Sequence, residues 1–388
     1  MISQLIKLMW NSKRNHSLLI IEIFFSFLVL FAVLSFIFYQ YTNYGRPLGF
    51  ESDNVWVVWF ESTHADANQL GQQKTAILNR IKAFESVESV TVSGSAIPFG
   101  MTRNGWNLRK EEQQELNVRL ILGDENYADV MNMPLVEGTW FGADATDLKY
   151  TPIIINQSLR NAFFENESAV GQILNEHDSR PAKVVGVIDN FRWRGDFQEL
   201  EKTVIMPMDK NSMETLLIKV KEGTTAEFEG QLSRAITQIA KGHQIEIEHL
   251  TDKRKSINNL IIVPGIIMLT VCGFLIFNVI LGLFGILWSN INQRRGEIGT
   301  RRALGATKVF ITIQFIGEVV VIATFALLLG IFFAIQLPIL GVFGIDNSIY
   351  FKAIFVTIFF IYFLVILCAF YPSWQASKIH PAVALHAD

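Results

Sequence analysis

The sequence predicts an α-helical membrane protein with four transmembrane helices and a large extracytoplasmic α+β domain between the first and second helices. Half of the 388 residues are hydrophobic, and only 18% are charged, against about 25% in ordinary soluble domains. The apolar residues concentrate in four blocks, each long enough to supply the ~20 residues that cross a bilayer. A segment with short β-branched strands and amphipathic helices separates the first block from the other three.

Four helices are expected to span the membrane, and four wholly buried helices of a soluble protein are the disfavoured alternative. The spans cover residues 17–43, 257–290, 307–338 and 349–371. The first is too long for the apolar core of a signal peptide, and no small-residue cleavage site follows it. We therefore expect it to act as an uncleaved signal anchor.

The basic residues predict the orientation, because Lys and Arg in short loops mark the cytoplasmic side. Those of the short segments are Lys7, Lys13, Arg14, Arg294, Arg295, Arg301, Arg302, Lys308 and Lys378. The expected cytoplasmic parts are residues 1–16, 291–306 and the tail 372–388. The expected outer parts are the domain 44–256 and a short turn at 339–348, which has no Lys or Arg. Lys253, Arg254 and Lys255 disagree, but long domains are translocated largely regardless of charge.

The outer domain, residues 44–256, is expected to be α+β with two lobes that divide near residue 150. Runs typical of strands are 54–60, 86–94, 116–122, 182–188 and 215–220. Thr224 and Glu227 have the spacing of a capping box that would open a helix. Both cysteines, Cys272 and Cys368, fall inside predicted spans. A disulfide framework is therefore excluded from the outer domain.

Several classes of site are absent from the sequence. It has no HExxH, no Cys/His cluster with zinc spacing, no GxSxG elbow and no kinase signature. The P-loop pattern GxxxxGK[ST] is also missing, and the glycines of GEIGTRRALGATK match it only superficially. We therefore predict no catalytic residue, no metal site and no bound cofactor in this chain.

The segment 291–306, between the second and third spans, carries four arginines, Arg294, Arg295, Arg301 and Arg302. Read as a helix, it pairs Glu297 with Arg301 at i, i+4, and Gly305 is placed to end it in a left-handed conformation. Thr307 can then cap the third span. The arginines fit a determinant of topology, a contact to anionic lipids or a docking surface. Nucleic acid is excluded, since a short segment fixed between two spans offers neither a groove-reading fold nor an aromatic platform.

Two carboxylates lie within predicted spans, Glu22 in the first and Glu318 in the third. Ionisable groups in a membrane are costly and mark candidate functional sites. One reading is an ion or proton relay, and the other is a polar group satisfied at a helix contact or near the inner headgroups. The sequence shows no basic partner at similar depth, which argues against a relay.

The stretch RRGEIGTRRALGATKVFITIQFIGEVVVI (294–322) closely resembles the permease signature of MacB/FtsX-type ABC transporter subunits. The matching residues are Glu297, Ile298, Gly299, Arg301, Arg302, Ala303, Leu304, Gly305, Ala306 and Glu318. Gly296 departs from the family pattern, which has a polar or basic residue there. The ending YPSWQASKIHPAVALHAD and the segment AKVVGVIDNFRWRG of the outer domain are also similar to the family, so that the resemblance covers essentially the whole chain.

The resemblance implies that 291–306 is a coupling helix that docks on a separate ABC ATPase subunit, which holds the ATP and Mg. The implied coupling residues are Arg294, Arg295, Glu297, Ile298, Arg301, Arg302, Leu304 and Gly305, with Ile298 and Leu304 as apolar anchors. Residues 1–16 are similar to the family's amphipathic helix at the inner leaflet. The other implied partners are a second copy or a paralogue and membrane lipids, in a bacterial inner membrane.

The family's mechanism, mechanotransmission, implies that ATP-driven motion passes through the spans to the outer domain. The chain is then a non-catalytic permease subunit. A MacB-like outer domain favours efflux of peptide-like, antibiotic or siderophore cargo through a periplasmic adaptor and an outer-membrane duct. Lipoprotein release, FtsX-like activation of cell-wall hydrolases and a receptor role are the alternatives.

Overall fold

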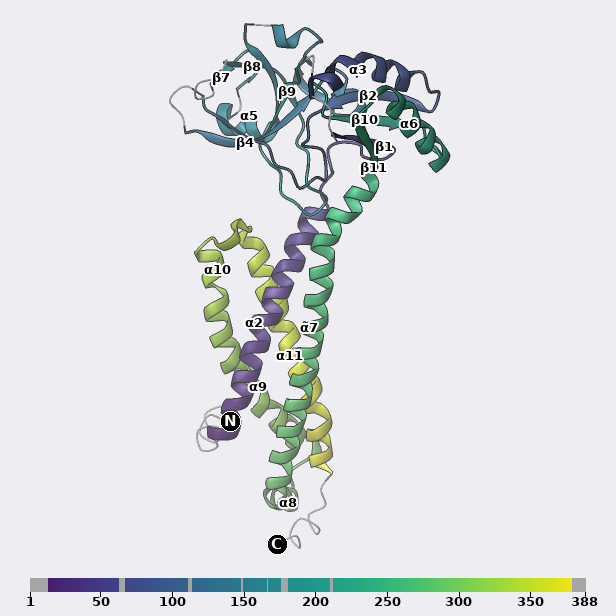
Figure 1. Cartoon of the computed structure of the whole chain (residues 1–388). Coiled ribbons are helices and arrows are strands. Elements are labelled where there is room, and N and C mark those ends of the chain that lie inside the picture. The colour runs from purple at the N-terminus through teal and green to yellow at the C-terminus, as the bar shows by residue number, and fades with distance from the viewer. Residues whose placement is uncertain are drawn as a thin grey trace. The chain divides into compact units, whose positions relative to one another are not determined.

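The computed structural model describes residues 13–62, 67–110, 114–147, 149–165, 167–175, 181–209 and 212–378. The chain divides into two units (Figure 1). The helical unit consists of residues up to Thr42 and from Val263 onward, and the sheet unit is Asn43–Ile262. The predicted amphipathic helix 1–16 lies outside the described residues except for 13–16, and the end of the predicted tail, from 379 onward, also lies outside them.

Within the described residues, four helices are long and apolar enough to cross a membrane. They are α2 (Lys13–Tyr44), α7 (Leu250–Gln293), α9 (Lys308–Ala334) and α11 (Asn347–Ser377). The predicted spans 17–43, 257–290 and 349–371 each lie inside one of these helices. The third, 307–338, continues past α9 into the short helix α10 (Gln336–Ile339). A 3₁₀ turn, η2 (Val342–Gly344), leads to α11.

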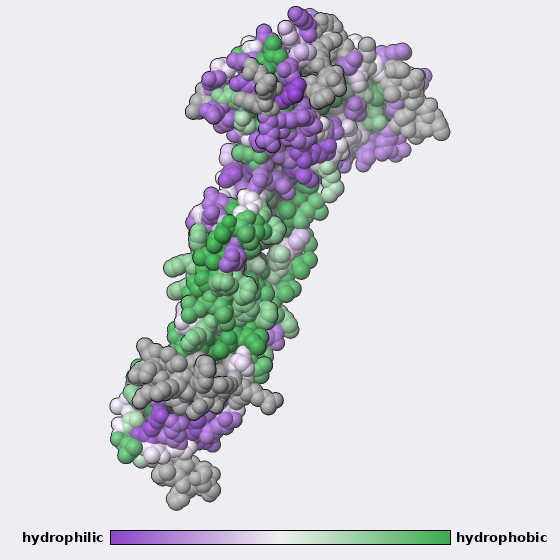
Figure 2. Space-filling view, turned by 90° about the vertical axis from the view of Figure 1, so that its left-hand side faces the viewer, coloured by the Kyte–Doolittle hydropathy of each residue, from purple (hydrophilic) through white to green (hydrophobic). Residues whose placement is uncertain are grey.

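The core of the helical unit is built from residues that recur at helical spacing. On α2, Ile23, Phe27 and Phe31 are buried, because positions four apart share one face of a helix. Gly330 of α9 allows close packing there, since a Cβ atom at this position would lie 2.4 Å from Cδ1 of Phe27. In the helical unit most of α7 is exposed, and Figure 2 shows apolar side chains gathered over the helices.

The described part of the sheet unit contains one sheet of eleven strands. The strands are β1 (Val55–Ser62), β2 (Val87–Ser93), β3 (Gly105–Leu108), β4 (Leu116–Gly123), β5 (Leu135–Gly138), β6 (Thr151–Asn156), β7 (Ile173–Leu174), β8 (Ala182–Ile188), β9 (Thr203–Pro207), β10 (Thr215–Val220) and β11 (His243–His249). The helices are α3 (Ala67–Lys82), α4 (Tyr127–Met131), α5 (Gln157–Phe164) and α6 (Ala226–Ile239), with a 3₁₀ turn η1 (Ala145–Asp147). The strand order is β11-β1-β10-β2-β4-β9-β6-β8-β5, while β3 pairs with β4 and β7 pairs with β8.

The sheet has two lobes, but they do not divide near residue 150. Strands β11, β1, β10 and β2 form one lobe, and β3–β9 form the other. The single pair Ser93–Gly123 joins β2 to β4 between them. The second lobe is thus inserted into the first, because the chain leaves after β2 and returns at β10. Strand alternation could not reveal this, since it says which residues are strand but not which strands pair.

Alternating side chains build two layers around the first lobe. Trp56 and Val58 of β1 face α3 and α6, in a cluster that includes Ile77 and Leu232. Val55 and Val57 face a second cluster, which also contains residues of α4 and of the second lobe. The period of two along the strand therefore separates a layer local to this lobe from a core shared by both lobes.

In the sheet unit, α5 and α6 have defined N-caps, and that of α6 tests an expectation from the sequence. Asn156 caps α5, accepting a 3.1 Å hydrogen bond from the backbone N–H of Leu159. The capping box at Thr224 is wrong, because the N-cap of α6 is Thr225. The hydroxyl of Thr224 instead donates to the carbonyl of Lys221 at 2.5 Å, so it stabilises the preceding turn.

Candidate functional site

The basic segment between α7 and α9 forms a separate short helix, α8 (Arg295–Ala303). The sequence suggested one helix starting at 291, but Ile291 belongs to the last turn of α7, and the chain leaves helical geometry at Arg294 (φ −103°, ψ 18°). Glu297 lies in the first turn of α8, and Arg301 and Arg302 lie in the last. This distribution of charge complements the helix dipole.

The end of α8 has the predicted geometry. Gly305 is left-handed, with φ +94°. Its N–H donates to the carbonyl of Arg302 at 3.2 Å, and the N–H of Ala306 donates to that of Arg301 at 3.0 Å. This is the Schellman pattern, which satisfies carbonyls at a helix end. Thr307 then caps α9 by accepting from the N–H of Phe310 at 3.2 Å.

A closed ring of five polar side chains, which we call the coupling ring, fixes α8 to α9. Arg294 donates to Glu297 at 2.7 Å and to Glu318 of α9 at 2.8 Å. Gln314 donates to Glu318 at 3.2 Å and accepts from Arg301 at 2.6 Å. Arg301 also pairs with Glu297, as predicted, and this closes the ring.

Glu318 therefore has a basic partner, contrary to the expectation from the sequence. The ion pair Arg294–Glu318 joins residues 24 positions apart, and the guanidinium also lies over the ring of Phe315, 5.2 Å from its centroid. The hydrogen bond from Arg294, with further attraction from Arg301, lowers the pKa of Glu297, so this carboxylate is charged at neutral pH. The arrangement is a structural clamp that neutralises two carboxylates with two arginines.

An apolar cluster lies beside the coupling ring. It consists of Ile291, Ile298, Ile311, Phe315 and Ala376, with Ala306 at its edge. Ile298 was expected as an apolar anchor for the ATPase, and the structure places its side chain in this cluster, only 3% exposed. Its face of α8 packs on α7, α9 and α11, because these helices supply the apolar surface that it covers.

The outward face of α8 carries the remaining predicted residues. Leu304 is 83% exposed, and Arg295, Thr300 and Gly305 are exposed too. Arg302 is half-buried and donates from Nη1 to the carbonyl of Ala306 at 2.9 Å. The surface that α8 and its C-cap present thus includes Arg295 and Leu304, together with Thr300 and Gly305.

Glu22 lies in a different environment from Glu318. It is half-buried on α2, and its carboxylate lies against the backbone of α7 at Gly282. A Cβ atom at Gly282 would be 2.6 Å from both carboxylate oxygens. The structure therefore places Glu22 at a contact between α2 and α7.

Sequence reasoning missed a second polar cluster, which we call the clasp. Arg192 follows β8 and is 1% exposed. Its guanidinium donates to the carbonyls of Asn43, Arg46 and Asp196, and to that of Pro47 at 3.2 Å. Asn43 belongs to the last turn of α2. One buried side chain thus joins the end of α2 to the loop after β8.

Asp196 of the same loop joins it to the beginning of α7. Arg254 binds its carboxylate with both nitrogens of a fork, at 2.7 and 2.9 Å. Asn258, one turn later, donates to it at 2.6 Å and accepts from its backbone N–H at 3.1 Å. Burial alone raises the pKa of Asp196, but these hydrogen bonds outweigh it and hold the pKa below its usual value.

The clasp explains an apparent anomaly of charge. Arg254, one of the basic residues that disagreed with the predicted orientation, has its counterion within the sheet unit. Gly195 permits the close approach: its φ is +109°, and a Cβ atom there would lie 2.8 Å from Oδ1 of Asn258. The only sequence signal was RWRGD itself, which shows polar residues beside a strand but not their partners.

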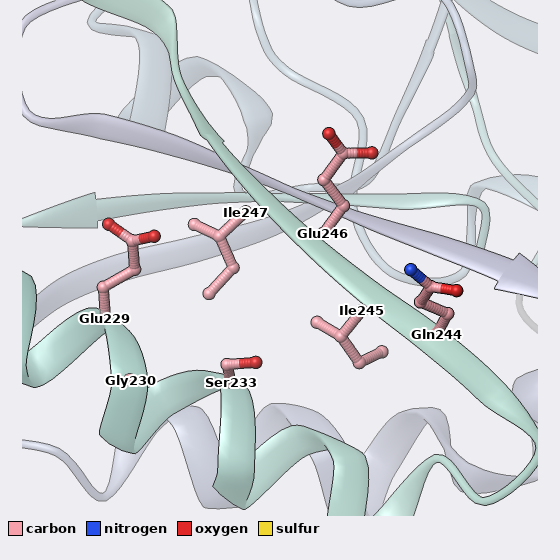
Figure 3. A pocket seen from close by; sticks show the side chains of 7 residues that line it. All are labelled: Glu229, Gly230, Ser233, Gln244, Ile245, Glu246 and Ile247. Atoms are coloured by element: carbon pink, nitrogen blue, oxygen red, sulfur yellow. The ribbon is translucent and has the colours of Figure 1, made fainter.

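Other candidate sites are few in the part of the chain that the structure describes. Within it, no group of three or more His, Cys, Asp or Glu residues could hold a metal ion. An open hollow of about 540 Å³ lies between α6 and β11 (Figure 3). The coupling ring and the clasp bind helices to one another and to the sheet, and neither offers the geometry of a catalytic centre.

Comparisons with known proteins agree with the division of the chain into a helical unit and a sheet unit. Residues 26–235 match the MacB-like periplasmic core domain, and residues 266–381 match the FtsX-like permease C-terminal family. The macrolide export ATP-binding/permease protein MacB of Escherichia coli is 25% identical over 358 residues, covering 84% of this chain and 54% of that protein. MacB of Rhodopseudomonas palustris strain HaA2 is 26% identical over 215 residues, covering 52% of this chain and 32% of that protein.

Two solved structures are similar over about half of the chain. The periplasmic region of MacB from Actinobacillus actinomycetemcomitans has a TM-score of 0.38 at 15% identity, covering 54% of this chain and 94% of that one. The extracellular domain of the transporter YknZ from Gram-positive bacteria has a TM-score of 0.36 at 15% identity, covering 50% and 100%. The chain spans between about a third and a half of the length of the two curated relatives. On the two family matches, which together cover most of its residues, the chain belongs to the MacB/FtsX-type ABC transporter permeases.

Proposed function

We propose that this chain is the permease subunit of an ABC-type mechanotransmission system. An ATPase on a separate chain, which binds the ATP and Mg, docks on α8 and moves it, and the motion reaches the sheet unit. The observation that carries the proposal is the construction of α8: an exposed surface of Arg295 and Leu304 on a helix whose opposite face is held by the coupling ring and by Ile298.

For the ATPase to move the spans through α8, the contact between α8 and α9 must be stiff. The coupling ring supplies stiffness because charge-assisted hydrogen bonds are the strong ones, and a fork such as that of Arg294 fixes orientation as well. Ile298 adds apolar contacts with α9 and α11. Force on Leu304 is therefore expected to move α9 with α8 instead of bending the loop between them.

The clasp supports transmission at the other end. Arg192 holds the last turn of α2, and Asp196 holds Arg254 and Asn258 of α7. Both helices are thereby attached to one loop of the sheet unit. A displacement of either helix along its axis is expected to pull on this loop.

We infer that the protein lies in a bacterial inner membrane with α8 and both termini in the cytoplasm and the sheet unit in the periplasm. The basic residues of α8 support this orientation. A membrane-impermeant thiol reagent applied to spheroplasts should label Ser348→Cys and spare Thr300→Cys; both positions are exposed. Cys272 and Cys368 are buried and should remain unlabelled. The reverse pattern would contradict the orientation.

The cargo is proposed from the relatives, whose names describe macrolide export. We propose efflux of peptide-like or antibiotic-like cargo, with a periplasmic adaptor and an outer-membrane duct as partners. A second copy or a paralogue, together with lipids, is expected to cover the exposed apolar surface of α7.

Affinity purification from the native membrane in a mild detergent tests the proposal. A P-loop ATPase should co-purify with the wild type and be lost with Leu304→Asp and with Arg295→Glu. Two matched controls, Leu340→Asp and Lys352→Glu, change residues that are also exposed, with Leu340 at 70%. They lie near the turn between α9 and α11 and should retain the ATPase.

The same preparation distinguishes the possible functions. An adaptor or duct that co-purifies would support efflux, a bound lipoprotein would point to lipoprotein release, and a cell-wall hydrolase would point to signalling. Retention of the ATPase by both α8 variants would refute docking at α8.

A further inference from the structure

Strand β11 forms one edge of the sheet. It pairs antiparallel with β1, from Trp56–His249 to Ser62–His243, and with no other strand among the described residues. Its seven residues extend over about 24 Å at ~3.4 Å per residue. The side away from β1 therefore offers a row of backbone donors and acceptors that another strand can bind.

The hollow between α6 and β11 lies along this free edge. It is lined by Glu229, Gly230 and Ser233 of α6 and by the four consecutive residues 244–247 of β11. Successive side chains of a strand point to opposite faces, and Figure 3 shows Ile245 and Ile247 on the side of α6 and Gln244 and Glu246 on the other. Side chains from both faces of β11 line this one hollow, and this is possible only if the hollow borders the free edge of the strand. The space is thus where a further strand would lie.

The charged residues that line the hollow indicate what kind of segment can bind there. Among the described residues that line it, Glu229 and Glu246 are charged and none is Lys or Arg. Glu229 also meets Nε2 of His249 at 3.0 Å, and Arg234 approaches Gly230 from the same helix. Glu246 is exposed, so its charge is available to a residue placed opposite.

A second copy of this chain fits the edge poorly. Glu246 is the central residue of β11, so a symmetric antiparallel pair of two β11 strands would place Glu246 opposite Glu246. Like charges directly opposite each other destabilise a strand pair, whereas opposite charges stabilise it. The edge therefore disfavours self-association and favours a basic strand.

We propose that the free edge of β11 binds an extended segment of a partner protein by strand addition. The segment carries Lys or Arg opposite Glu246, and alternate apolar side chains that pack on Ile245 and Ile247. Backbone hydrogen bonds supply affinity, and the alternating side chains supply specificity. The proposal rests on the sheet unit alone and does not depend on docking of an ATPase at α8.

A strand bound at β11 lies next to α7, because β11 leads directly into this helix. His249 ends β11 and Leu250 begins α7, so no loop intervenes between the docking edge and the helix. A partner strand on β11 is held beside the first turn of α7, the helix that the clasp also grips through Arg254. The partner can thus sense or resist movement of this helix directly.

The test uses the full chain in a neutral detergent and a labelled nine-residue peptide of alternating Lys and Val. Fluorescence anisotropy should show saturable binding of this peptide, and much weaker binding of a Glu/Val peptide and of a Lys/Val peptide with a central proline. Glu246→Lys should weaken binding about tenfold, since it replaces an opposite-charge pair by a like-charge pair. Glu222→Lys changes an exposed residue outside the hollow and should leave binding unchanged.

Hydrogen exchange locates the bound peptide independently of the variants. The Lys/Val peptide should slow exchange of alternate amides of β11. Equal binding of the Glu/Val peptide, an unchanged affinity of Glu246→Lys, or protection elsewhere without protection of β11 would overturn the proposal. Protection of β11 that rises with protein concentration in the absence of peptide would assign the edge to a second copy and would also overturn it.

Discussion

Replacing Arg192 by Met should loosen the clasp without emptying the space that the side chain fills. Met is unbranched and similar in length but cannot donate hydrogen bonds. The carbonyl of Asn43 keeps a second donor, the N–H of Arg46 at 3.1 Å. The carbonyls of Arg46, Pro47 and Asp196 lose the donor that Arg192 supplies.

The expected cost follows from these three carbonyls. A buried acceptor left without a donor costs about 1–3 kcal/mol. Relief from burying a charge and partial access of water reduce the sum, and we expect about 3 kcal/mol for opening of the clasp. At ~1.4 kcal/mol per factor of ten, this corresponds to an approximately hundredfold increase in local opening. Arg192→Lys keeps the charge but lacks the fork, so an increase of about tenfold is expected.

Native-state hydrogen exchange of the full chain measures this opening. The reporting amides are those of Arg192, which donates to Leu48 at 2.8 Å, and Phe99, which donates to Trp193 at 2.9 Å. Arg234→Met, at an exposed arginine of α6, is the matched control and should not change them. If exchange in Arg192→Met stays within threefold of the wild type, the carbonyls have other donors and the argument for the clasp is wrong.

Three further changes test other contacts. Glu318→Gln removes one charge from the coupling ring and should speed exchange of the α8 amides about fivefold, as expected for ~1 kcal/mol; unchanged exchange would show that the ring does not hold α8. Gly330→Ala should lower the thermal midpoint in detergent, because the new methyl group collides with Phe27 at a cost of about 1–3 kcal/mol, whereas Gly273→Ala, which enters open space, should not. The lowered pKa of Asp196 stabilises the folded sheet unit fully above the ordinary aspartate pKa of about 3.9, and this contribution is lost as the pH falls through the folded value. The stability difference between the wild type and Asp196→Asn should therefore shrink in acid, and a constant difference from pH 6 to pH 3 would contradict the assignment.

Local patterns predicted the local structure well. The four long helices follow from runs of apolar residues, and the left-handed Gly305, the cap at Thr307 and the pair Glu297–Arg301 follow from spacings of at most four residues. Such features depend on the chain within one or two turns. The end of α8 and the beginning of α9 could therefore be predicted from neighbouring residues alone.

Non-local contacts decided what the sequence could not show. The partner of Glu318 is Arg294, which lies 24 positions away. The hydropathy pattern does not indicate that these two side chains meet. The direction of Ile298 depends on where α9 and α11 supply apolar surface. Arg192 meets acceptors that lie 145 to 149 positions earlier, and no local pattern identifies such partners.

The inserted second lobe has a consequence for biosynthesis. Strands β3–β9 form a continuous stretch of chain, so this lobe has all its strands soon after they are synthesised. Strand β1 pairs with β10 and β11, which are made only after the whole insertion. Since long-range strand pairing is slow and leaves edges exposed, β1 must wait unpaired while the second lobe folds. The nascent protein therefore needs protection at β1 during this interval, and slowing the appearance of β10 should increase aggregation or proteolysis before any later step is affected.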